Sequence, residues 1–375
     1  MNIALFFYFA CLILVWWSCQ GYIIYLYLNR RKPDKDLKQP QKHFFSIIVP
    51  TFNEEELIIK KIDGLKSLSS GNFEVFFADA SSDRTAEIIS KNINCLDSFR
   101  LIKSAARGRS SQINSALSLC KGDLILISDC DGAMPDDTLQ KLEREFQDES
   151  VGVAGACVLP LTENKYEKLF WEGQNALRFL ESGYGFCPVV IGVCYAFRKK
   201  ILGSLPQTVW ADDIYVPFFF NSEGFRTVYC RDIVAYELRC PVKAGEFIMH
   251  KMRKAGDNIK ELLRFSRQIK KMPAGWNIVY GTRFLQVIIL PFALFAFAIL
   301  FVFQPFVVKI CTVMFIILSV FPQFYILQKQ SNTKLKASFI SVAAMFLVAN
   351  SILFIADLKY IFSKGKFNYE KIADK

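Results

Sequence analysis

The chain has 375 residues, of which 52% are hydrophobic and 15% aromatic, and its formal net charge is +11. This apolar share excludes an ordinary soluble domain. Two histidines and eleven scattered cysteines without a CxxC pair exclude a His/Cys zinc site. The excess of Lys and Arg is better explained by basic residues that flank membrane spans than by nucleic-acid binding, so we expect no nucleic-acid partner.

The chain opens with an uncharged segment. Residues 1–29 contain no charged side chain and are long enough to cross about 30 Å of hydrocarbon as a helix. A secretory signal is the alternative, but the apolar stretch is long, its start lacks positive charge and no small-residue cleavage site is obvious. We therefore predict a transmembrane helix at 1–29 and a basic cytoplasmic linker at 30–43, with the N-terminus outside.

Residues 44–68, FFSIIVPTFNEEELIIKKIDGLKSL, indicate a strand, a loop and a helix. We predict a strand at Phe45–Val49 that Pro50 ends, because proline has no N–H to donate. Asn53–Glu56 supply cap-type and acidic residues at a helix N-terminus. Ligands of parallel sheets bind beyond the carboxyl ends of the strands, where Pro50–Glu54 would lie. An ordinary βα unit is the alternative.

Residues 73–89 repeat this design. Phe73–Ala78 is a predicted buried strand, and Asp79 falls at its end. Asp83 can cap the helix that we expect to start near Thr85. One carboxylate at a strand end is weak support for a site, and capping alone would explain Asp83.

A third unit, residues 122–146, ends its strand on two carboxylates. The strand Leu124–Ser128 leads into Asp129 and Asp131. Residues two apart in an extended segment point to the same side, so both carboxylates can face one ligand. Their mutual repulsion would be relieved by a divalent cation, either Mg²⁺ or Mn²⁺. A solvated acidic turn is the alternative.

Three strand-end motifs follow one another: PTFNEE (50–55), ADASSD (78–83) and DCD (129–131). In this order and spacing they resemble the family 2 glycosyltransferases, inverting enzymes of the GT-A fold, over residues 44–255. The resemblance implies an α/β fold, with a GT-A nucleotide-diphospho-sugar transferase domain of Rossmann-like mixed sheet at 44–243, flanked by transmembrane helices. The flanking membrane runs and the tail phrase FNYEKIADK resemble the membrane-bound polysaccharide-synthesising branch.

The resemblance also implies individual roles. Asp131, with Asp129, would bind the metal. Asp79 would stand for the carboxylate that reads the base, although Ala78 and Ala80 depart from the family's DDGSTD pattern. The residues implied to bind the nucleotide-sugar are Pro50, Thr51, Asn53, Glu54, Asp79, Arg109, Asn114 and Asp129.

Inverting transfer needs a base on the far side of the anomeric carbon from the leaving group. The family's catalytic Asp stands 11 positions before a Gly, and Asp213 to Gly224 spans the same interval. The resemblance therefore implies Asp213 as the catalytic base, with Asp212 replacing the family's Glu beside it and raising its pKa. A helix cap at this pair is the alternative.

Residues 192–197 resemble the floor of the acceptor site. Tyr195 or Phe197 could stack on a sugar there, and core strand residues are the alternative. HKMRK (250–254) stands where processive synthases have QxxRW, which puts Arg253 at the Arg position of the acceptor site. Lys254 replaces the Trp that stacks on the acceptor sugar, so processive synthesis does not follow from the resemblance.

The pattern of apolar residues in the last part of the chain predicts that it associates with a membrane. Residues 246–272 repeat apolar side chains with helical period, which predicts amphipathic interfacial helices at 244–283 on an anionic membrane surface, or else a helix packed on the domain. Uncharged runs at Phe284–Val308, Ile310–Gln328 and Ala337–Ala356 predict two or three spans at 284–363, before a tail at 364–375. Basic residues flank both ends of the last run, so its topology stays open, and a re-entrant hairpin would fit.

These patterns favour an inverting glycosyltransferase in the inner membrane of a bacterial-type cell, with a cytoplasmic catalytic domain. The donor would be a nucleotide-diphospho-sugar, most simply a UDP-sugar, used with Mg²⁺ or Mn²⁺. The acceptor would be a growing polysaccharide or a polyprenyl-linked glycan. Alternatives are a lipid glycosyltransferase that uses polyprenyl phosphate or diacylglycerol, a non-catalytic nucleotide-sugar sensor or scaffold, and a transporter. An oligomer or an envelope-assembly partner could complete a translocation channel.

Overall fold

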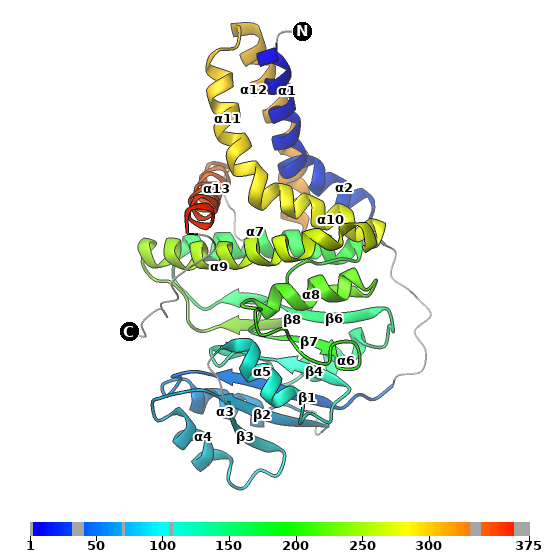
Figure 1. The fold of residues 1–375 in the computed structure, drawn as a ribbon, viewed down its shortest axis with the longest axis vertical. Helices are drawn as coiled ribbons and strands as arrows, with labels where there is room; N and C mark the ends of the chain where they lie inside the picture. The colour runs from blue at the N-terminus through cyan, green and yellow to red at the C-terminus, as the bar shows by residue number, and fades with distance from the viewer. Residues whose placement is uncertain (1–2, 32–40, 70–71, 105–107, 331–338, 364–375) are drawn as a thin grey trace.

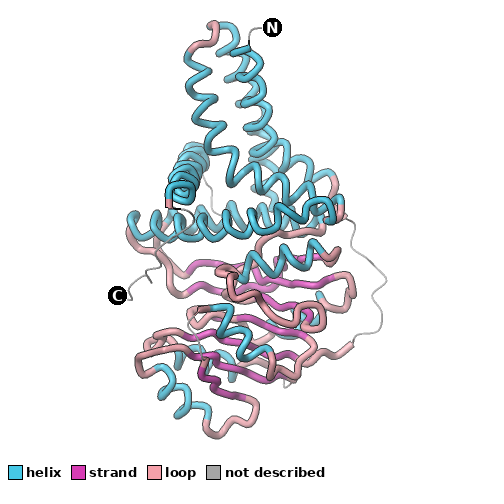
Figure 2. The backbone as a smooth tube through the Cα atoms, viewed as in Figure 1, coloured by secondary structure: helices cyan, strands magenta, loops and turns pink. Residues whose placement is uncertain are grey.

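The computed structural model describes residues 3–31, 41–69, 72–104, 108–330 and 339–363. A sheet with its covering helices forms the lower part, and long helices rise from it (Figure 1). Strands are confined to the lower part, whereas the upper part is helical (Figure 2). The tail predicted at 364–375 lies outside the described residues.

The sheet has eight strands in the order β3-β2-β1-β4-β7-β6-β8-β5. The three pairings that join β3, β2, β1 and β4 are parallel, whereas β7 runs antiparallel to both β4 and β6. This confirms the predicted α/β fold with a mixed sheet. The strands are β1 (Phe45–Thr51), β2 (Phe73–Asp79), β3 (Phe99–Lys103), β4 (Leu124–Ile127), β5 (Gly132–Ala133), β6 (Val151–Pro160), β7 (Tyr195–Arg198) and β8 (Arg226–Glu237).

Alternating side chains of the central strands build a core on each face of the sheet. Ile47 and Val49 of β1 pack with α3, α4, α6 and α7, whereas Ile48 packs with α5, α8 and α9. The domain helices are α3 (Ile58–Lys66), α4 (Thr85–Ile93), α5 (Arg109–Leu117), α6 (Thr138–Glu145), α7 (Lys165–Tyr184), α8 (Asp212–Ser222) and α9 (Ala244–Phe265). A short 3-10 turn follows at Ser266–Lys271.

Two local predictions about these elements can be compared with the structure. The prediction that Pro50 ends the first strand is wrong, because β1 continues through Pro50 to Thr51. Pairing of β1 with β4 stops at Ile48, so beyond that residue β1 is paired with β2 alone. A proline, which lacks an N–H, is tolerated in this part of the strand. The predicted cap is confirmed: the carboxylate of Asp83 accepts hydrogen bonds from the backbone N–H and the hydroxyl of Thr85, where α4 begins.

Four helices in the described residues are long and apolar enough to cross a membrane. The first, Ile3–Leu28, consists of α1 (Ile3–Trp16), a π-helical turn (Trp17–Gly21) and α2 (Tyr22–Leu28). The second, Ala274–Val302, consists of α10 (Ala274–Phe284), a π-helical turn (Leu285–Ile289) and α11 (Leu290–Val302). The others are α12 (Phe306–Gln330) and the stretch Ala343–Phe362 of α13 (Phe339–Phe362).

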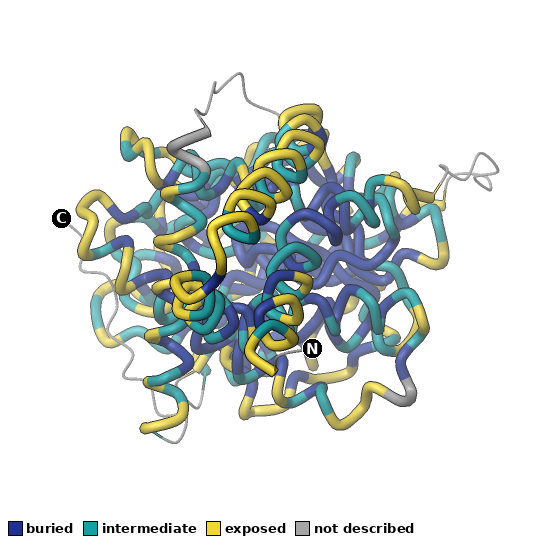
Figure 3. Tube along the Cα trace, turned by 90° about the horizontal axis from the view of Figure 1, so that it is seen from above, coloured by how far each residue is buried: buried dark blue, intermediate teal, exposed yellow. Residues whose placement is uncertain are grey.

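These helices begin and end at different residues from the uncharged runs of the sequence. Lys309 lies inside α12 rather than between two spans, and its ammonium group donates to the carbonyl of Val302 at 2.8 Å, across the turn that joins α11 to α12. The second span begins at Ala274, ten residues before the predicted run at Phe284. Exposed positions are frequent on the rising helices when they are seen from above (Figure 3), as expected for surfaces that contact lipid.

The last helix occupies a different level from the other three. α11, α12 and α1 rise together, whereas α13 lies at their base, just above α9 (Figure 1). It packs against α9, α7 and α11. The helix runs without a break through Asn350 and Ser351, so it is not the re-entrant hairpin that the sequence left open.

Candidate active site

A cavity of about 1230 Å³ lies between the sheet, the helices α7 and α9, and the membrane helices. Asp129 and Asp131 reach it from the loop between β4 and β5, and Asp213 reaches it from the start of α8. Three carboxylates from two distant parts of the chain therefore meet at one site. Asp79, predicted to join them, ends β2 and is not among the residues that line this cavity.

Asp131 lies in a surplus of negative charge. Burial, followed by the neighbouring charges of Asp129, Glu237 and Glu54, raises the pKa of Asp131 to about 7, although Arg239 opposes the shift. Arg239 itself binds Glu54 through two hydrogen bonds of 2.7 and 3.3 Å. One nearby arginine is thus shared among several carboxylates, and the site lacks a positive charge that a cation would supply.

The donor set suits a hard divalent cation. Asp129 and Asp131 offer carboxylate oxygens, which Mg²⁺ and Mn²⁺ prefer, together with phosphate oxygens and water. Within the described ranges no three His, Cys, Asp or Glu residues gather closely enough to hold an ion alone. One or two carboxylates with the remaining positions open are the usual arrangement for Mg²⁺ beside a phosphate substrate, so these residues fit the expected metal.

Asp212 and Asp213 have different surroundings although they are adjacent. Asp212 is buried, is paired with Arg109, and accepts a hydrogen bond of 2.5 Å from the hydroxyl of Tyr195. Arg109 also contacts Asp129 at 2.5 Å, so it bridges the metal loop and α8. Both carboxylate oxygens of Asp212 are therefore bound by neighbouring side chains, and this residue positions Arg109 and Tyr195 rather than accepting a proton.

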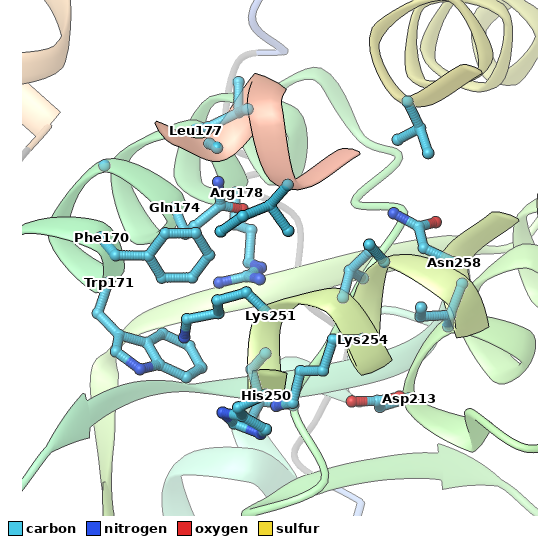
Figure 4. Close-up of a pocket in the computed structure, with 18 of the residues that line it drawn as sticks. Phe170, Trp171, Gln174, Leu177, Arg178, Asp213, His250, Lys251, Lys254 and Asn258 are labelled. Atoms are coloured by element: carbon cyan, nitrogen blue, oxygen red, sulfur yellow. The ribbon is translucent and has the colours of Figure 1, made fainter. Parts of the chain in front are cut away.

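Asp213 faces the cavity (Figure 4). Burial, followed by the charge of Asp212, raises the pKa of Asp213 to about 6, against the opposing charges of Lys254 and Arg109. A carboxylate with a pKa in this range is suited to accept a proton near neutral pH. Its backbone carbonyl accepts from the N–H of Val190 at 3.0 Å, which fixes the start of α8 beside the cavity.

The residues predicted to bind the nucleotide-sugar divide into two groups. Pro50, Glu54, Arg109 and Asp129 line the cavity. Thr51 and Asp79 instead bind each other at 2.8 Å, below the ends of β1 and β2. The remaining predicted residues, Asn53 and Asn114, are also absent from the lining and bind neighbouring loops through Ser81, Ser82 and the backbone of Leu205.

The predicted acceptor residues also divide. Arg253 lines the cavity from α9. Tyr195 and Phe197 are fully buried in β7, where they belong to the core on the α5 and α8 face, as in the alternative of core strand residues. Helix α9 packs on that same core through Ile259 and Leu262, which agrees with the alternative that this helix covers the domain.

Three residues near the carboxylates were not found by sequence reasoning. Glu237 ends β8 and Arg239 lies two residues beyond it, and pairing of β5 with β8 brings this end of the strand beside Asp131. Lys61 is buried under the metal loop and donates to the hydroxyl of Ser128 at 2.6 Å and to the carbonyl of Gly132 at 2.8 Å. The first two are charged residues at and just beyond the end of β8, a strand that was not among those predicted from the sequence.

Side chains of helices α7 and α9 line the cavity on the side of Asp213 (Figure 4). Lys251 of α9 is paired with the fully buried Glu167 of α7 at 2.8 Å, and Trp171 donates to the same carboxylate at 2.9 Å. His250 and Lys254 lie on the same stretch of α9, nearer to Asp213. Burial and the neighbouring cations lower the pKa of His250 to about 2, so its ring is neutral.

Comparison with known proteins places this geometry in context. Residues 46–205 match the profile described as glycosyl transferase family 2. An N-acetylglucosaminyltransferase of Rhizobium sp. (strain N33) is 23% identical over 240 residues, which cover 58% of this chain and 53% of that protein. A beta-monoglucosyldiacylglycerol synthase of Trichormus variabilis is 32% identical over 139 residues, which cover 36% of this chain and 29% of that protein. The chain thus spans about half the length of the first relatives it matches.

A mannosyltransferase from Pyrobaculum calidifontis, solved with GDP-mannose and Mn²⁺, has a similar fold with a TM-score of 0.74. It is 20% identical, and the likeness covers 96% of this chain and 100% of that one, membrane helices included. The sequence profile and the mixed sheet, which has carboxylates at its edge, both indicate the same fold. Residues 46–205 of this chain are therefore similar to glycosyl transferase family 2, and its domain has the GT-A fold.

Proposed function

We propose that this protein is an inverting, metal-dependent glycosyltransferase. It moves a sugar from a nucleotide-diphospho-sugar, most simply a UDP-sugar, to a hydroxyl of a growing polysaccharide or polyprenyl-linked glycan. The observation that carries the proposal is that Asp213, with a raised pKa, faces the same cavity as the pair Asp129 and Asp131. Such a cavity can hold the base on one side of the sugar and the diphosphate on the other.

The reaction follows from these positions. The acceptor hydroxyl gives its proton to the carboxylate of Asp213 while its oxygen forms a bond to the anomeric carbon. The bond from that carbon to the diphosphate oxygen breaks, and the nucleoside diphosphate leaves with the electron pair. Asp131 and Asp129 would hold a divalent cation, which would supply positive charge to the leaving group. Arg109 keeps Asp129 and the start of α8 in register.

Asp213→Asn tests this proposal against a non-catalytic nucleotide-sugar sensor. The amide cannot accept the proton, so transfer should fall by about 10²–10⁴-fold while nucleotide binding persists. Nucleotide release by the purified protein would be measured across UDP-, GDP- and dTDP-sugars, with and without Mn²⁺. Asp136→Asn, on an exposed position of the loop beyond the site, is the matched control and should leave transfer unchanged.

Two outcomes would contradict the proposal. Transfer by the Asp213→Asn variant at the wild-type rate would remove Asp213 as the base. A wild-type protein that binds nucleotide-sugar and releases no nucleotide with any acceptor would favour the sensor.

A second candidate is a glycosyltransferase that acts on a lipid, and the extent of the cavity favours it. The lining continues from Asp213 past α9 to Leu327 of α12 and to Phe346 and Leu353 of α13. An acceptor with a hydrocarbon chain could therefore approach the site from the membrane. Turnover on lipid alone, compared with turnover on soluble oligosaccharide, separates the two candidates.

A further inference from the structure

Arg178 is a buried cation in the wall of the cavity. It lies on α7, is 7% exposed, and lines the cavity together with Lys251 and Lys254 (Figure 4). Its Nε and Nη1 are buried and have no hydrogen-bond partner within the described part of the chain. Its guanidinium lies 5.5 Å from the ring centre of Trp171 and 5.6 Å from that of Tyr229. Ring contacts orient the group, but they leave its donors unsatisfied.

Four other cations around the cavity are paired with carboxylates, whereas the half-buried Arg253 and Lys254 of α9 take part in no ion pair among the described residues. Arg109 contacts Asp129 and Asp212, Arg239 binds Glu54, Arg283 binds Glu181, and Lys251 binds Glu167. Arg178 has no comparable ion pair with any residue that the structure describes. A buried charge without a partner is costly, and a buried donor without an acceptor adds to that cost. Such a group is retained where a ligand supplies the missing acceptors.

The surroundings of Arg178 select an anion. Nδ1 of His250, on the facing helix, is also buried without a hydrogen-bond partner in the described residues. Lys251, Arg253 and Lys254 follow it on α9, so three cations lie along this stretch. A phosphate presents several acceptor oxygens and negative charge, which matches a planar guanidinium better than a neutral hydroxyl does.

The membrane end of the same cavity has a large apolar part. Val287 and Leu290 of the second span, Leu327 of α12, and Phe346 and Leu353 of α13 line it there, beside the polar side chains of Gln286, Gln323, Gln328 and Asn350. A small free anion would leave the apolar part unfilled, whereas a hydrocarbon chain would lie against it. One ligand with an anionic group and a hydrocarbon chain fits both regions because they belong to one cavity.

We infer that Arg178 binds the phosphate of a lipid-linked acceptor. The hydrocarbon chain lies among the apolar residues of the membrane helices, and the glycan or alcohol hydroxyl extends toward Asp213. The phosphate is an anchor and takes no part in the bond that forms. This inference rests on the proposed function in one respect, which is that the bound lipid is the acceptor. Among the acceptors considered above, it favours a phosphorylated lipid over diacylglycerol and over free polysaccharide.

Binding of three probes to the full-length protein in detergent tests the inference without any donor sugar. The probes are farnesyl phosphate, farnesol and inorganic phosphate, titrated by calorimetry. We expect farnesyl phosphate to bind at least about tenfold more tightly than either of the others. Arg178→Gln should lose at least about tenfold in affinity for farnesyl phosphate and keep its affinity for farnesol, and Arg178→Lys should fall between.

The control is Arg231→Gln. Arg231 also stacks on an aromatic ring, 4.5 Å from the centre of Phe179, but it is not among the residues that line the cavity, so its variant should bind all three probes as the wild type does. If Arg178→Gln fails to fold, the comparison of probes on the wild type and on Arg178→Lys still decides. Equal affinity of the wild type for farnesol and farnesyl phosphate would overturn the inference, as would unchanged binding by Arg178→Gln.

The other outcomes are equally distinct. Inorganic phosphate that binds as tightly as farnesyl phosphate would overturn the lipid part and indicate a simple anion site. Asp213→Asn should bind farnesyl phosphate normally. If that variant still transfers sugar, the proposed role of Asp213 fails while the binding results stand on their own.

Discussion

The adjacent carboxylates of Asp212 and Asp213 have different surroundings, and this difference determines which of them can accept a proton. Asp212 is neutralised by Arg109 and Tyr195, whereas Asp213 faces the cavity with its pKa raised to about 6. The charge of Asp212 in turn disfavours ionisation of Asp213. A pair of this kind yields one positioning residue and one base.

The raised pKa of Asp213 predicts how activity depends on pH. The base must be unprotonated, so kcat/KM should rise about tenfold per pH unit below pH 6 and level off above it. A profile from pH 5 to 8 at saturating Mn²⁺ measures this directly. A flat profile across pH 5 to 7 would contradict the assignment of Asp213 as the base.

Gly192 predicts how closely the site is packed. A Cβ at this position would lie 2.7 Å from Oδ2 of Asp129 and 2.8 Å from Nη2 of Arg109, so Gly192→Ala must displace the pair. A displacement of about 1 Å can cost about 10²-fold in rate, and we expect a loss of this order in nucleotide release. Gly203→Ala, which meets nothing within 4 Å, is the control and should retain full activity.

Part of the site could be read from the sequence because it lies at strand ends. Asp129, Asp131 and Asp213 follow from motif order and spacing, and all three reach one cavity. Glu237 and Arg239 could not be placed, since they join the site through a pairing of β5 with β8 across more than a hundred residues. The core position of Tyr195 likewise depends on which side of β7 faces the domain interior.

At the scale of elements, the helices α7 and α9 are linked by buried polar contacts, which we call the α7–α9 joint. Their link is the buried pair of Glu167 and Lys251, at 2.8 Å, with Trp171 as a second donor. Helical periodicity in the sequence identified α9, but periodicity cannot tell whether a basic face meets a membrane or a cavity. Lys251 and Lys254 line the cavity, so part of the basic face serves the site.

Lys251→Met tests this joint. It leaves the charge of Glu167 buried without its cation, and breaking such a pair should cost about 3–5 kcal/mol. The midpoint of thermal unfolding in detergent would fall accordingly. The double variant Glu167→Gln with Lys251→Met should recover most of the loss, because no unpaired charge remains. A single variant as stable as the wild type would show that the pair contributes nothing to the joint.

At the scale of the whole molecule, the helices that rise from the domain set its orientation. The turn between α11 and α12 and the start of α1 lie at the end far from the sheet (Figure 1). Basic residues of the linker predict that the sheet is cytoplasmic. The uncharged runs of the sequence predict that these helices exist. The position of α13 close to the domain depends on its packing against α9 and α7, which the sequence pattern does not reveal.

Labelling with a membrane-impermeant maleimide tests this orientation. In a background with Cys311→Ser, a Phe303→Cys variant should react in intact cells, because residue 303 is 79% exposed at the far turn. Cys95, exposed on the domain, should react only after the membrane is permeabilised. Labelling of Cys95 in intact cells would place the domain outside.

The two π-helical turns, Trp17–Gly21 and Leu285–Ile289, lie side by side: the side chain of Gln286 donates to the carbonyl of Ser18 at 2.7 Å. Each widened turn holds one residue more than a regular α-helical path, and both contribute to the cavity. Deleting a single residue from either turn would therefore return that helix to a regular α-helical path and remove one of the widened turns. Ser18 and Gln286, which join the two turns, both stand in the wall of the cavity, so such a deletion would change the cavity wall while leaving the membrane helices in place.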